Sequence, residues 1–286
     1  MPGHVVRFLH NMDATSKSLT SLVVSLYRNR GLIFQMTKRE VIGRYRGSVF
    51  GLAWSFFNPV LMLAVYTFVF SFVFKSRWGG AATAPVGHGE FAMMLFVGMT
   101  VHTLFAECIN RAPLLVLQNA SYVKKVIFPL EIFPVIALCS AVFHLFISML
   151  VLIAGLLLVS GSVHLTVLLF PLVVLPLFLL SLGLGWFLAA TGVYVRDIAQ
   201  ATAFLASVLM FLSPVFYPIS ALPEKYRIWL QLNPLTFFIE ESRAVLVGGS
   251  LPDFATLGLY LVASVVVAWL GYWWFQSARR GFADVI

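Results

Sequence analysis

Residues 132–160 read IFPVIALCSAVFHLFISMLVLIAGLLLVS and contain no Asp, Glu, Lys or Arg. A helix needs about 20 apolar residues to cross the hydrocarbon core of a bilayer, which is about 30 Å thick. Because a helix satisfies its backbone polar groups internally, this stretch predicts a membrane-spanning helix. The hydropathy of the chain predicts six such helices, at residues 49–74, 91–117, 132–160, 165–193, 198–217 and 254–275.

The composition indicates a membrane protein as well. Of the 286 residues, 60% are hydrophobic and 10% are charged, whereas a soluble domain has roughly 25% charged residues. These values exclude an ordinary water-soluble domain and predict an all-α integral membrane protein with six transmembrane helices. No cleavable signal peptide is expected, because the first 45 residues are polar and basic and lack an apolar stretch before a cleavage site.

The Lys and Arg residues are concentrated on one side of the predicted helices. This group lies before the first helix, in the second and fourth connections and in the tail: Arg7, Lys17, Arg28, Arg30, Lys38, Arg39, Arg44, Arg46, Lys124, Lys125, Arg196, Arg279 and Arg280. The positive-inside rule predicts that this side is cytoplasmic. Both termini are therefore expected in the cytoplasm.

This topology divides the chain into three parts. They are a cytoplasmic N-terminal segment at residues 1–48, a membrane domain at 49–276 and a cytoplasmic tail at 277–286. The net charge of +8 then reflects membrane topology, and no nucleic-acid partner is expected.

The N-terminal segment contains an amphipathic pattern. Apolar residues repeat at helical spacing among polar ones, at Leu19, Leu22, Val23 and Leu26. This pattern predicts a helix at the membrane interface, which Gly31 is expected to interrupt. A second stretch, residues 32–45, mixes apolar and basic residues and is expected at the lipid headgroups. The segment serves either as a juxtamembrane anchor or as a specific docking element, and the pattern leaves both open.

The connection between the fifth and sixth predicted helices is long but not simply polar. Residues 213–253 read SPVFYPISALPEKYRIWLQLNPLTFFIEESRAVLVGGSLPD, in which aromatic residues alternate with Pro and Gly. Short re-entrant or interfacial helices are expected here rather than a solvated loop.

Motifs of catalysis are missing from the sequence. It contains no GxxxxGK[ST] phosphate loop and no HExxH, GxSxG or CxxC motif. If ATP drives this protein, another chain must hydrolyse it. Cys108 and Cys139 both lie in apolar segments and are expected to be small buried residues, without a disulfide or metal site.

The candidate general acids and bases inside predicted transmembrane helices are His102, Glu107 and His144. Such residues are candidates for function by default, because a charge in the bilayer is costly. His102 and Glu107 point to different sides of one helix. We expect interior hydrogen bonds or ion pairs, with Arg111 as the partner of Glu107 one turn away.

Basic and aromatic residues gather where the chain first enters the bilayer. Arg44 and Arg46 are suited to hold a pyrophosphate through forked hydrogen bonds, although positive-inside anchoring explains them equally. The aromatic residues of this region are Tyr45, Trp54, Phe57, Tyr66 and Phe70. Aromatic rings pack against the apolar C–H faces of sugars, so they are candidates to line a glycan channel. Helix packing is the alternative explanation.

Several stretches resemble the permease subunits of type-2 ABC exporters of bacterial polysaccharides. These stretches are REVIGRYRGSVFGLAWSFFNPVLMLAVYTFVF from Arg39, ASYVKKVIFPLEIFPV after the second predicted helix, YVRDI after the fourth, and SPVFYP followed by NPLTFFIEESR after the fifth. They occur in the family's order within residues 32–243. The resemblance is greatest to the O-antigen branch, Wzm, and the capsule and teichoic-acid permeases share the architecture.

This resemblance implies a half-transporter in the bacterial inner membrane. Two copies of the chain would pair with two copies of a separate nucleotide-binding subunit, which would bind ATP and Mg while this chain binds no cofactor or metal. The homodimer would move an undecaprenyl-diphosphate-linked polysaccharide from the cytoplasm to the periplasm. The chain itself would not be an enzyme.

The resemblance also implies roles for individual residues. The candidates for coupling to the ATPase subunit are Tyr122, Lys124, Lys125, Phe128 and Glu131. Arg44 and Arg46 would lie near the entrance for the lipid diphosphate. Short helices within residues 218–253 would form a periplasmic gate.

Other functions remain open from the residues alone. A type-2 exporter of a small lipid or drug would share the fold. A membrane glycosyltransferase or acyltransferase would need a cluster of acid and base groups. Glu240 and Glu241 form the only adjacent acidic pair, and adjacent side chains on a helix diverge by about 100°.

Overall fold

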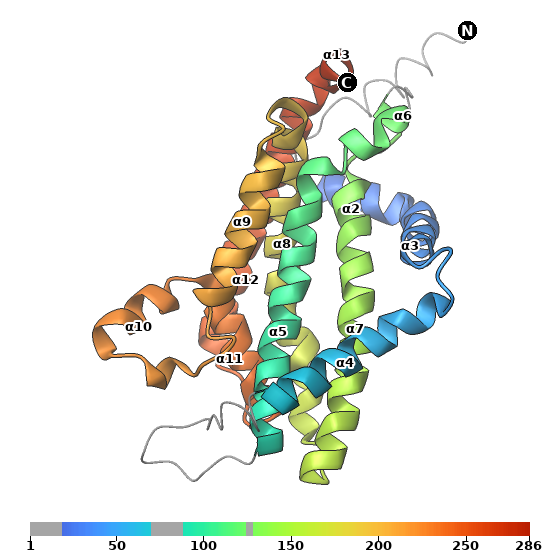
Figure 1. Ribbon diagram of the computed structural model, residues 1–286. Coiled ribbons are helices and arrows are strands. Elements are labelled where there is room, and N and C mark those ends of the chain that lie inside the picture. The colour runs from blue at the N-terminus through green and yellow to red at the C-terminus, as the bar shows by residue number, and fades with distance from the viewer. Residues whose placement is uncertain (1–18, 70–87, 124–127) are drawn as a thin grey trace, which may run out of the picture.

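The computed structural model describes residues 19–69, 88–123 and 128–286 (Figure 1). Every regular element within these ranges is helical. The helices are α2 (Leu19–Arg28), α3 (Arg30–Arg44), α4 (Trp54–Phe68), α5 (His88–Arg111), α6 (Ala120–Val123), α7 (Ile132–Ser160), α8 (Phe170–Tyr194), α9 (Ile198–Phe211), α10 (Glu224–Gln231), α11 (Pro234–Leu246), α12 (Phe254–Ala278) and α13 (Phe282–Val285). Short 3-10 turns join several of them, including η1 (Gly51–Ala53), η3 (Ala112–Leu114) and η7 (Arg279–Gly281).

Long helices run side by side through the centre of the molecule (Figure 1). Among the described residues, five segments are long and apolar enough to cross a membrane: Gly51–Phe68, Gly89–Leu114, Ile132–Ser160, Leu165–Tyr194 and Phe254–Val285. They match five of the six predicted transmembrane helices. An all-helical membrane protein is thus confirmed. The exact set of six spans stays a prediction.

The fifth predicted span, residues 198–217, contains a shorter helix than expected. Helix α9 has 14 residues and ends at Phe211. The next residues form turns, where Ser213 Oγ donates to the carbonyl of Leu209 at 2.6 Å. Pro214 follows, which lacks an N–H and disfavours helical backbone in the residue before it. The apolar run is therefore longer than the helix that it forms.

The N-terminal segment forms two helices rather than one broken at Gly31. Helix α2 ends at Arg28, and Gly31 lies inside α3. The junction is Asn29, whose side chain donates to the backbone carbonyl of Ser25 at 2.8 Å. A single Gly inside a helix costs only about 1 kcal/mol, whereas the Asn29 side chain competes for backbone hydrogen bonds. The expected interruption therefore occurs two residues earlier.

The segment after α9 contains the short helices that the sequence predicts. Helix α10 projects from the side of the bundle, while α11 lies against its core (Figure 1). Helix α11 begins at Pro234, and the Asn233 side chain caps it by accepting from the N–H of Leu235 at 3.0 Å. Pro suits this first position because its missing N–H would have no helical partner.

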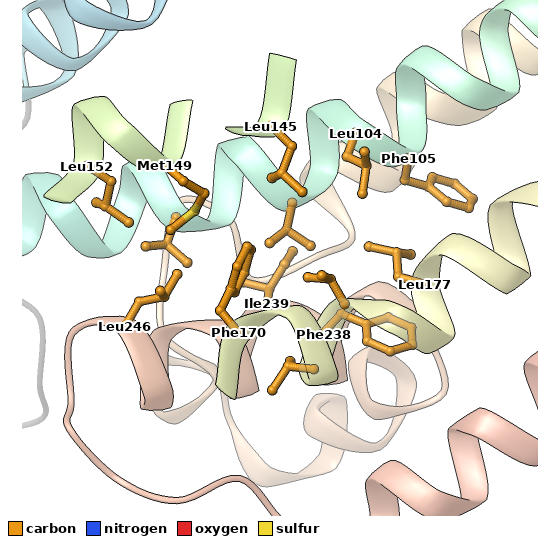
Figure 2. Close-up of a cluster of buried hydrophobic side chains, with 14 of the residues drawn as sticks. Leu104, Phe105, Leu145, Met149, Leu152, Phe170, Leu177, Phe238, Ile239 and Leu246 are labelled. Carbon is orange, nitrogen blue, oxygen red and sulfur yellow. The ribbon is translucent and has the colours of Figure 1, made fainter. Parts of the chain in front are cut away.

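Helix α11 contributes directly to the largest apolar core. Figure 2 shows this core, in which α11 meets α5, α7 and α8. The labelled side chains are Leu104, Phe105, Leu145, Met149, Leu152, Phe170, Leu177, Phe238, Ile239 and Leu246. The segment between α9 and α12 is thus anchored in the bundle by apolar packing as well as by its chain connections.

Helices α8 and α12 touch through their backbones. A Cβ added at Gly271 would meet the backbone of Gly183, and one added at Gly183 would lie 2.6 Å from the carbonyl of Val267. Small residues at a contact between membrane helices let the two backbones approach closely. The closer approach increases van der Waals contact, which matters in lipid because the hydrophobic effect does not drive one helix onto another there. Gly258, on the same helix α12, has nothing within 4 Å of an added Cβ.

We therefore expect Gly271→Leu to destabilise the protein strongly. The larger side chain would force α8 and α12 apart, and overpacking of this kind costs about 1–3 kcal/mol or more. Thermal unfolding of the detergent-solubilised protein, followed by fluorescence-detected gel filtration, measures the effect. Gly258→Leu is the matched control and should leave the unfolding temperature nearly unchanged. Equal loss in both variants would contradict the close α8–α12 contact.

Candidate functional site

A charged cluster joins α3, α5 and α7. Arg44, the last residue of α3, directs Nη2 to Oε1 of Glu107 on α5 at 2.5 Å. The Nη1 atom of Arg44 lies 3.3 Å from Nδ1 of His144 on α7. The same His144 nitrogen lies 3.1 Å from Oε2 of Glu107. Three side chains that are far apart in the sequence therefore meet at one point.

Further residues extend this cluster on both sides. Arg111 Nη1 lies 3.6 Å from Oε1 of Glu107, which confirms the predicted pair, and Arg111 also forms an ion pair with Glu40. The hydroxyl of Tyr45 lies 3.3 Å from Nε2 of His144. We call this group the Arg44 cluster: Glu40, Arg44, Tyr45, Glu107, Arg111 and His144. Its two Arg residues and two carboxylates balance when His144 is neutral.

The cluster is open on one side. The Arg44 side chain is 36% exposed, whereas that of Glu107 is 13% exposed. The cation thus lies at the accessible rim and the anion beneath it. Arg46 is exposed and enters no ion pair in the part of the chain that the structure describes. The structure therefore brings Arg44 but not Arg46 into the cluster.

The four candidate channel residues that the structure describes do not form one continuous row. Trp54 and Phe57 lie together at 6.5 Å between ring centroids, both exposed, and Phe50 packs on each of them. Tyr45 points to His144, and Tyr66 packs against the apolar core. Phe70 lies outside the described residues. Phe50 lies within the predicted first span but before α4, and sequence reasoning did not include this exposed ring among the candidates.

The proposed coupling residues divide into an aromatic surface and a buried carboxylate. Tyr122 and Phe128 are half-buried, with ring centroids 4.5 Å apart, and Phe133 stacks on Phe128 at 5.4 Å. Glu131 is only 6% exposed. Lys124 and Lys125 lie outside the described residues.

Glu131 connects distant parts of the chain. Ser25 Oγ on α2 donates to Oε1 of Glu131 at 2.8 Å, and Arg279 donates to Oε2 at 3.1 Å. Arg279 also donates to the backbone carbonyl of Phe128 at 2.9 Å. The backbone carbonyl of Glu131 accepts from Trp186 Nε1 at 2.9 Å. Glu131 therefore positions the aromatic surface and does not form part of its exposed face. Sequence reasoning missed Ser25, Trp186 and Arg279 as its supports.

A second buried charge lies toward the other end of the bundle. The Arg243 side chain on α11 is 3% exposed. It donates to the carbonyls of Met94 at 2.8 Å, Pro214 at 2.6 Å and Val215 at 2.8 Å, and to Glu240 Oε1 at 2.8 Å. Burial lowers the pKa of Arg243 to about 10, although Glu240 opposes this, so the guanidinium stays protonated at neutral pH.

Arg243 ties three elements together. Its guanidinium joins α11 to α5 and to the turns after α9, and Gly98 on α5 provides the room. A Cβ added at Gly98 would lie 2.7 Å from Nη2 of Arg243. The sequence signal for this role was an Arg among the apolar residues of a predicted short helix, a position where an unpaired charge is not tolerated.

Other polar residues do not assemble an acid–base site in the described part of the chain. His102 Nε2 lies 3.0 Å from the carbonyl of Ala206, which confirms an interior hydrogen bond. Glu240 pairs with Arg243, whereas Glu241 accepts from the backbone N–H of Asp253 at 3.1 Å. The adjacent carboxylates thus serve different partners. No group of three metal-binding side chains was found among the described residues.

Apolar helices joined by buried charge pairs define this chain as a multi-pass membrane protein. It belongs to the ABC-2 type transporter family, whose sequence model matches residues 31–247. This match confirms the resemblance to type-2 ABC permeases.

The relatives agree with this family. The chain is 30% identical over 272 residues to an O-antigen export system permease protein RfbA of Myxococcus xanthus, covering 93% of this chain and 99% of that one. A Klebsiella pneumoniae protein of the same description is 22% identical over 263 residues, covering 90% and 97%. The polysialic acid transport protein KpsM of Escherichia coli is 25% identical over 95 residues, covering 33% and 37%. The expected similarity to the O-antigen branch is thereby confirmed.

We expect Arg243→Met to lower the stability of the protein. The substitution removes the donors for three backbone carbonyls, and a buried acceptor left without a partner costs about 1–3 kcal/mol. Thermal unfolding in detergent should show the loss, with Arg46→Met as a control in which an exposed Arg is replaced. An unchanged unfolding temperature for Arg243→Met would show that α11 is held by apolar packing alone.

Proposed function

We propose that this chain is the transmembrane subunit of an ATP-driven exporter of bacterial polysaccharide, with an O-antigen type glycan as cargo. The observation that carries the proposal is the similarity, over 93% of the chain, to a protein described as an O-antigen export permease. The partial match to KpsM makes a capsular polysaccharide the second candidate cargo. Teichoic acid remains a further cargo of the same general class.

The proposed cargo is carried on undecaprenyl diphosphate and moves from the cytoplasm to the periplasm across the inner membrane. The orientation follows from charge. Basic residues such as Arg28, Arg196 and Arg279 belong to connections and ends that the positive-inside rule assigns to the cytoplasm. Helices α6 and α13 lie together at one end of the bundle (Figure 1), and Arg279 belongs to the turn η7 directly before α13. We assign this end to the cytoplasm.

The chain is proposed to act as a homodimer with two ATPase subunits. Its sequence has no phosphate-binding loop, so the partner would bind ATP and Mg. The half-buried aromatic surface of Tyr122 and Phe128 is the docking site that we propose for the partner. Aromatic side chains of this kind often dominate the binding energy of interfaces.

Arg44 is proposed to contact the lipid diphosphate. A guanidinium binds phosphate through two parallel N–H groups, and the partial exposure of Arg44 at the rim of its cluster supports access by a headgroup. Trp54 and Phe57 are proposed to contact the glycan, because both rings are exposed on α4. The short helices α10 and α11 are proposed to form the periplasmic gate.

Transport then requires two arrangements of the helices with different exposure of the channel. The ATPase subunits would close when they bind nucleotide and open when they release it. This movement would shift the equilibrium between the two arrangements of the helices. The buried contacts of Glu131 support this route, because they connect the proposed docking surface to α2, to α8 and to the C-terminal tail. A movement of the surface would therefore be passed to several helices.

Deletion of this gene in its host tests the proposed function. Lipid-linked polysaccharide should accumulate on the cytoplasmic face of the inner membrane, and expression of the chain from a plasmid should release it. The glycan is located by labelling spheroplasts before and after permeabilisation. Normal surface glycan without any retained polymer would instead indicate a small-molecule exporter, and the glycan-specific roles would be rejected.

We expect the double variant Tyr122→Ala/Phe128→Ala to bind the ATPase subunit more weakly. Truncation of aromatic hot spots costs about 2 kcal/mol or more, so the apparent affinity should fall at least about tenfold. Co-purification and titration of the two subunits in detergent measure this change. Tyr226→Ala, which removes an exposed ring from α10, is the control. Unaltered binding by the double variant would place the docking surface elsewhere.

A further inference from the structure

We propose that Glu107 is a built-in competitor for the anion site on Arg44. In the arrangement described here its carboxylate occupies the position that the diphosphate of the lipid carrier takes during transport. This inference rests on the proposed function and adds a residue that controls the affinity for the anionic headgroup. The ligand class is a polyprenyl diphosphate.

The argument begins with the donors of Arg44. Its Nη2 is paired with Glu107 Oε1 at 2.5 Å, and its Nη1 faces His144 Nδ1 at 3.3 Å. Both terminal nitrogens are thus directed at internal partners. Phosphate binding by a guanidinium uses the same forked N–H groups. A diphosphate and the Glu107 carboxylate therefore compete for one set of donors.

Glu107 has other partners if Arg44 leaves it. Arg111 Nη1 lies 3.6 Å from the same Oε1, and His144 Nδ1 lies 3.1 Å from Oε2. A buried charge without a partner would be strongly unfavourable, but this carboxylate would keep a cation and a hydrogen-bond donor. The exchange of Arg44 from Glu107 to a diphosphate is therefore feasible without leaving an isolated charge.

His144 can stabilise the cluster both when Arg44 is paired with Glu107 and when Arg44 has turned to a diphosphate, because the proton of its neutral ring can lie on either nitrogen. With a proton on Nδ1 the ring donates to Glu107, and with Nδ1 unprotonated it accepts from Arg44 instead. The Tyr45 hydroxyl lies 3.3 Å from Nε2 and can donate or accept accordingly. The imidazole thus stabilises the carboxylate at the moment when Arg44 turns to another anion.

The exposure of the two charges sets the direction of access. Arg44 is 36% exposed and Glu107 is 13% exposed, so an incoming headgroup reaches the cation first. Arg44 ends α3, whereas Glu107 belongs to α5. Exchange of the anion would replace a contact between two helices by a contact with the ligand. A ligand that binds one arrangement of the helices more tightly than another shifts the equilibrium towards the arrangement that it binds.

Binding of undecaprenyl diphosphate to the complete complex tests this inference. The permease and its ATPase subunit are reconstituted in nanodiscs of phosphatidylcholine, and binding of the radiolabelled lipid is titrated. If Arg44 is free of Glu107 about one tenth of the time, Glu107→Gln should tighten the apparent binding about tenfold. Glu90→Gln, the same charge change at the far end of α5, is the matched control and should have no effect.

The dependence on Arg44 is tested in the same way. Arg44→Gln should weaken binding, and the gain from Glu107→Gln should disappear in the double variant. Undecaprenyl monophosphate and phosphatidylglycerol, added as unlabelled competitors, distinguish a diphosphate site from general attraction to anionic lipid. If Glu107→Gln does not fold, Glu107→Asp retains the charge but shortens the side chain, and should tighten binding to a smaller extent.

The possible failures are distinguishable. Weaker or equal binding by both Glu107 variants, together with weaker binding by Arg44→Gln, would overturn the competition and leave the proposed function intact. Equal binding by Arg44→Gln and the wild type would remove Arg44 as the anion site and overturn the inference as well. Failure of the proposed function is seen separately, as normal surface glycan after gene deletion.

Discussion

A charge inside an apolar helix bundle must have a partner, because neither lipid nor hydrocarbon side chains can solvate it. In this chain the partners come from different helices. Arg44 meets Glu107 and His144, Glu131 meets Ser25 and Arg279, and Arg243 meets backbone carbonyls from two other elements. Each pairing specifies which helices are neighbours. Apolar packing alone would specify this less sharply, since lipid is as apolar as the side chains that it would replace.

Close packing then fixes the distances between the helices. Gly183 and Gly271 allow the backbones of α8 and α12 to touch, and Gly98 leaves room for the Arg243 guanidinium. Two kinds of contact thus act together. Polar groups select the neighbouring helices, and small residues allow those neighbours to approach. The result is a core in which α11 is enclosed with α5, α7 and α8 (Figure 2).

Local patterns predicted those features that depend on residues near each other in the sequence. Five long helices followed from apolar runs, the short helices α10 and α11 followed from residues 213–253, and the Glu107–Arg111 pair followed from helical spacing. The Arg44–Glu107 and Glu131–Arg279 pairs could not be found in this way. Their partners are 63 and 148 residues apart, so the pairing depends on which helices pack together. The length of α9 was overestimated because hydropathy does not respond to the turn before Pro214.

Helix α4 differs from the rest of the bundle in how little of it is covered. Only 6% of the residues in its apolar segment, Gly51–Phe68, are buried within the chain, compared with 67% of an apolar 18-residue stretch inside Gly89–Leu114. Its inner neighbour α5 is thus held by several helices, whereas α4 presents most of its surface outward. That surface is open to the proposed second copy of the chain and to the proposed glycan. The proposed homodimer gives this asymmetry a physical reason: the residues that bind cargo must remain uncovered in one chain, while the residues that transmit force must be buried. The exposed rings of Trp54 and Phe57 fit the proposed cargo surface, and the buried Glu131 fits the proposed coupling route.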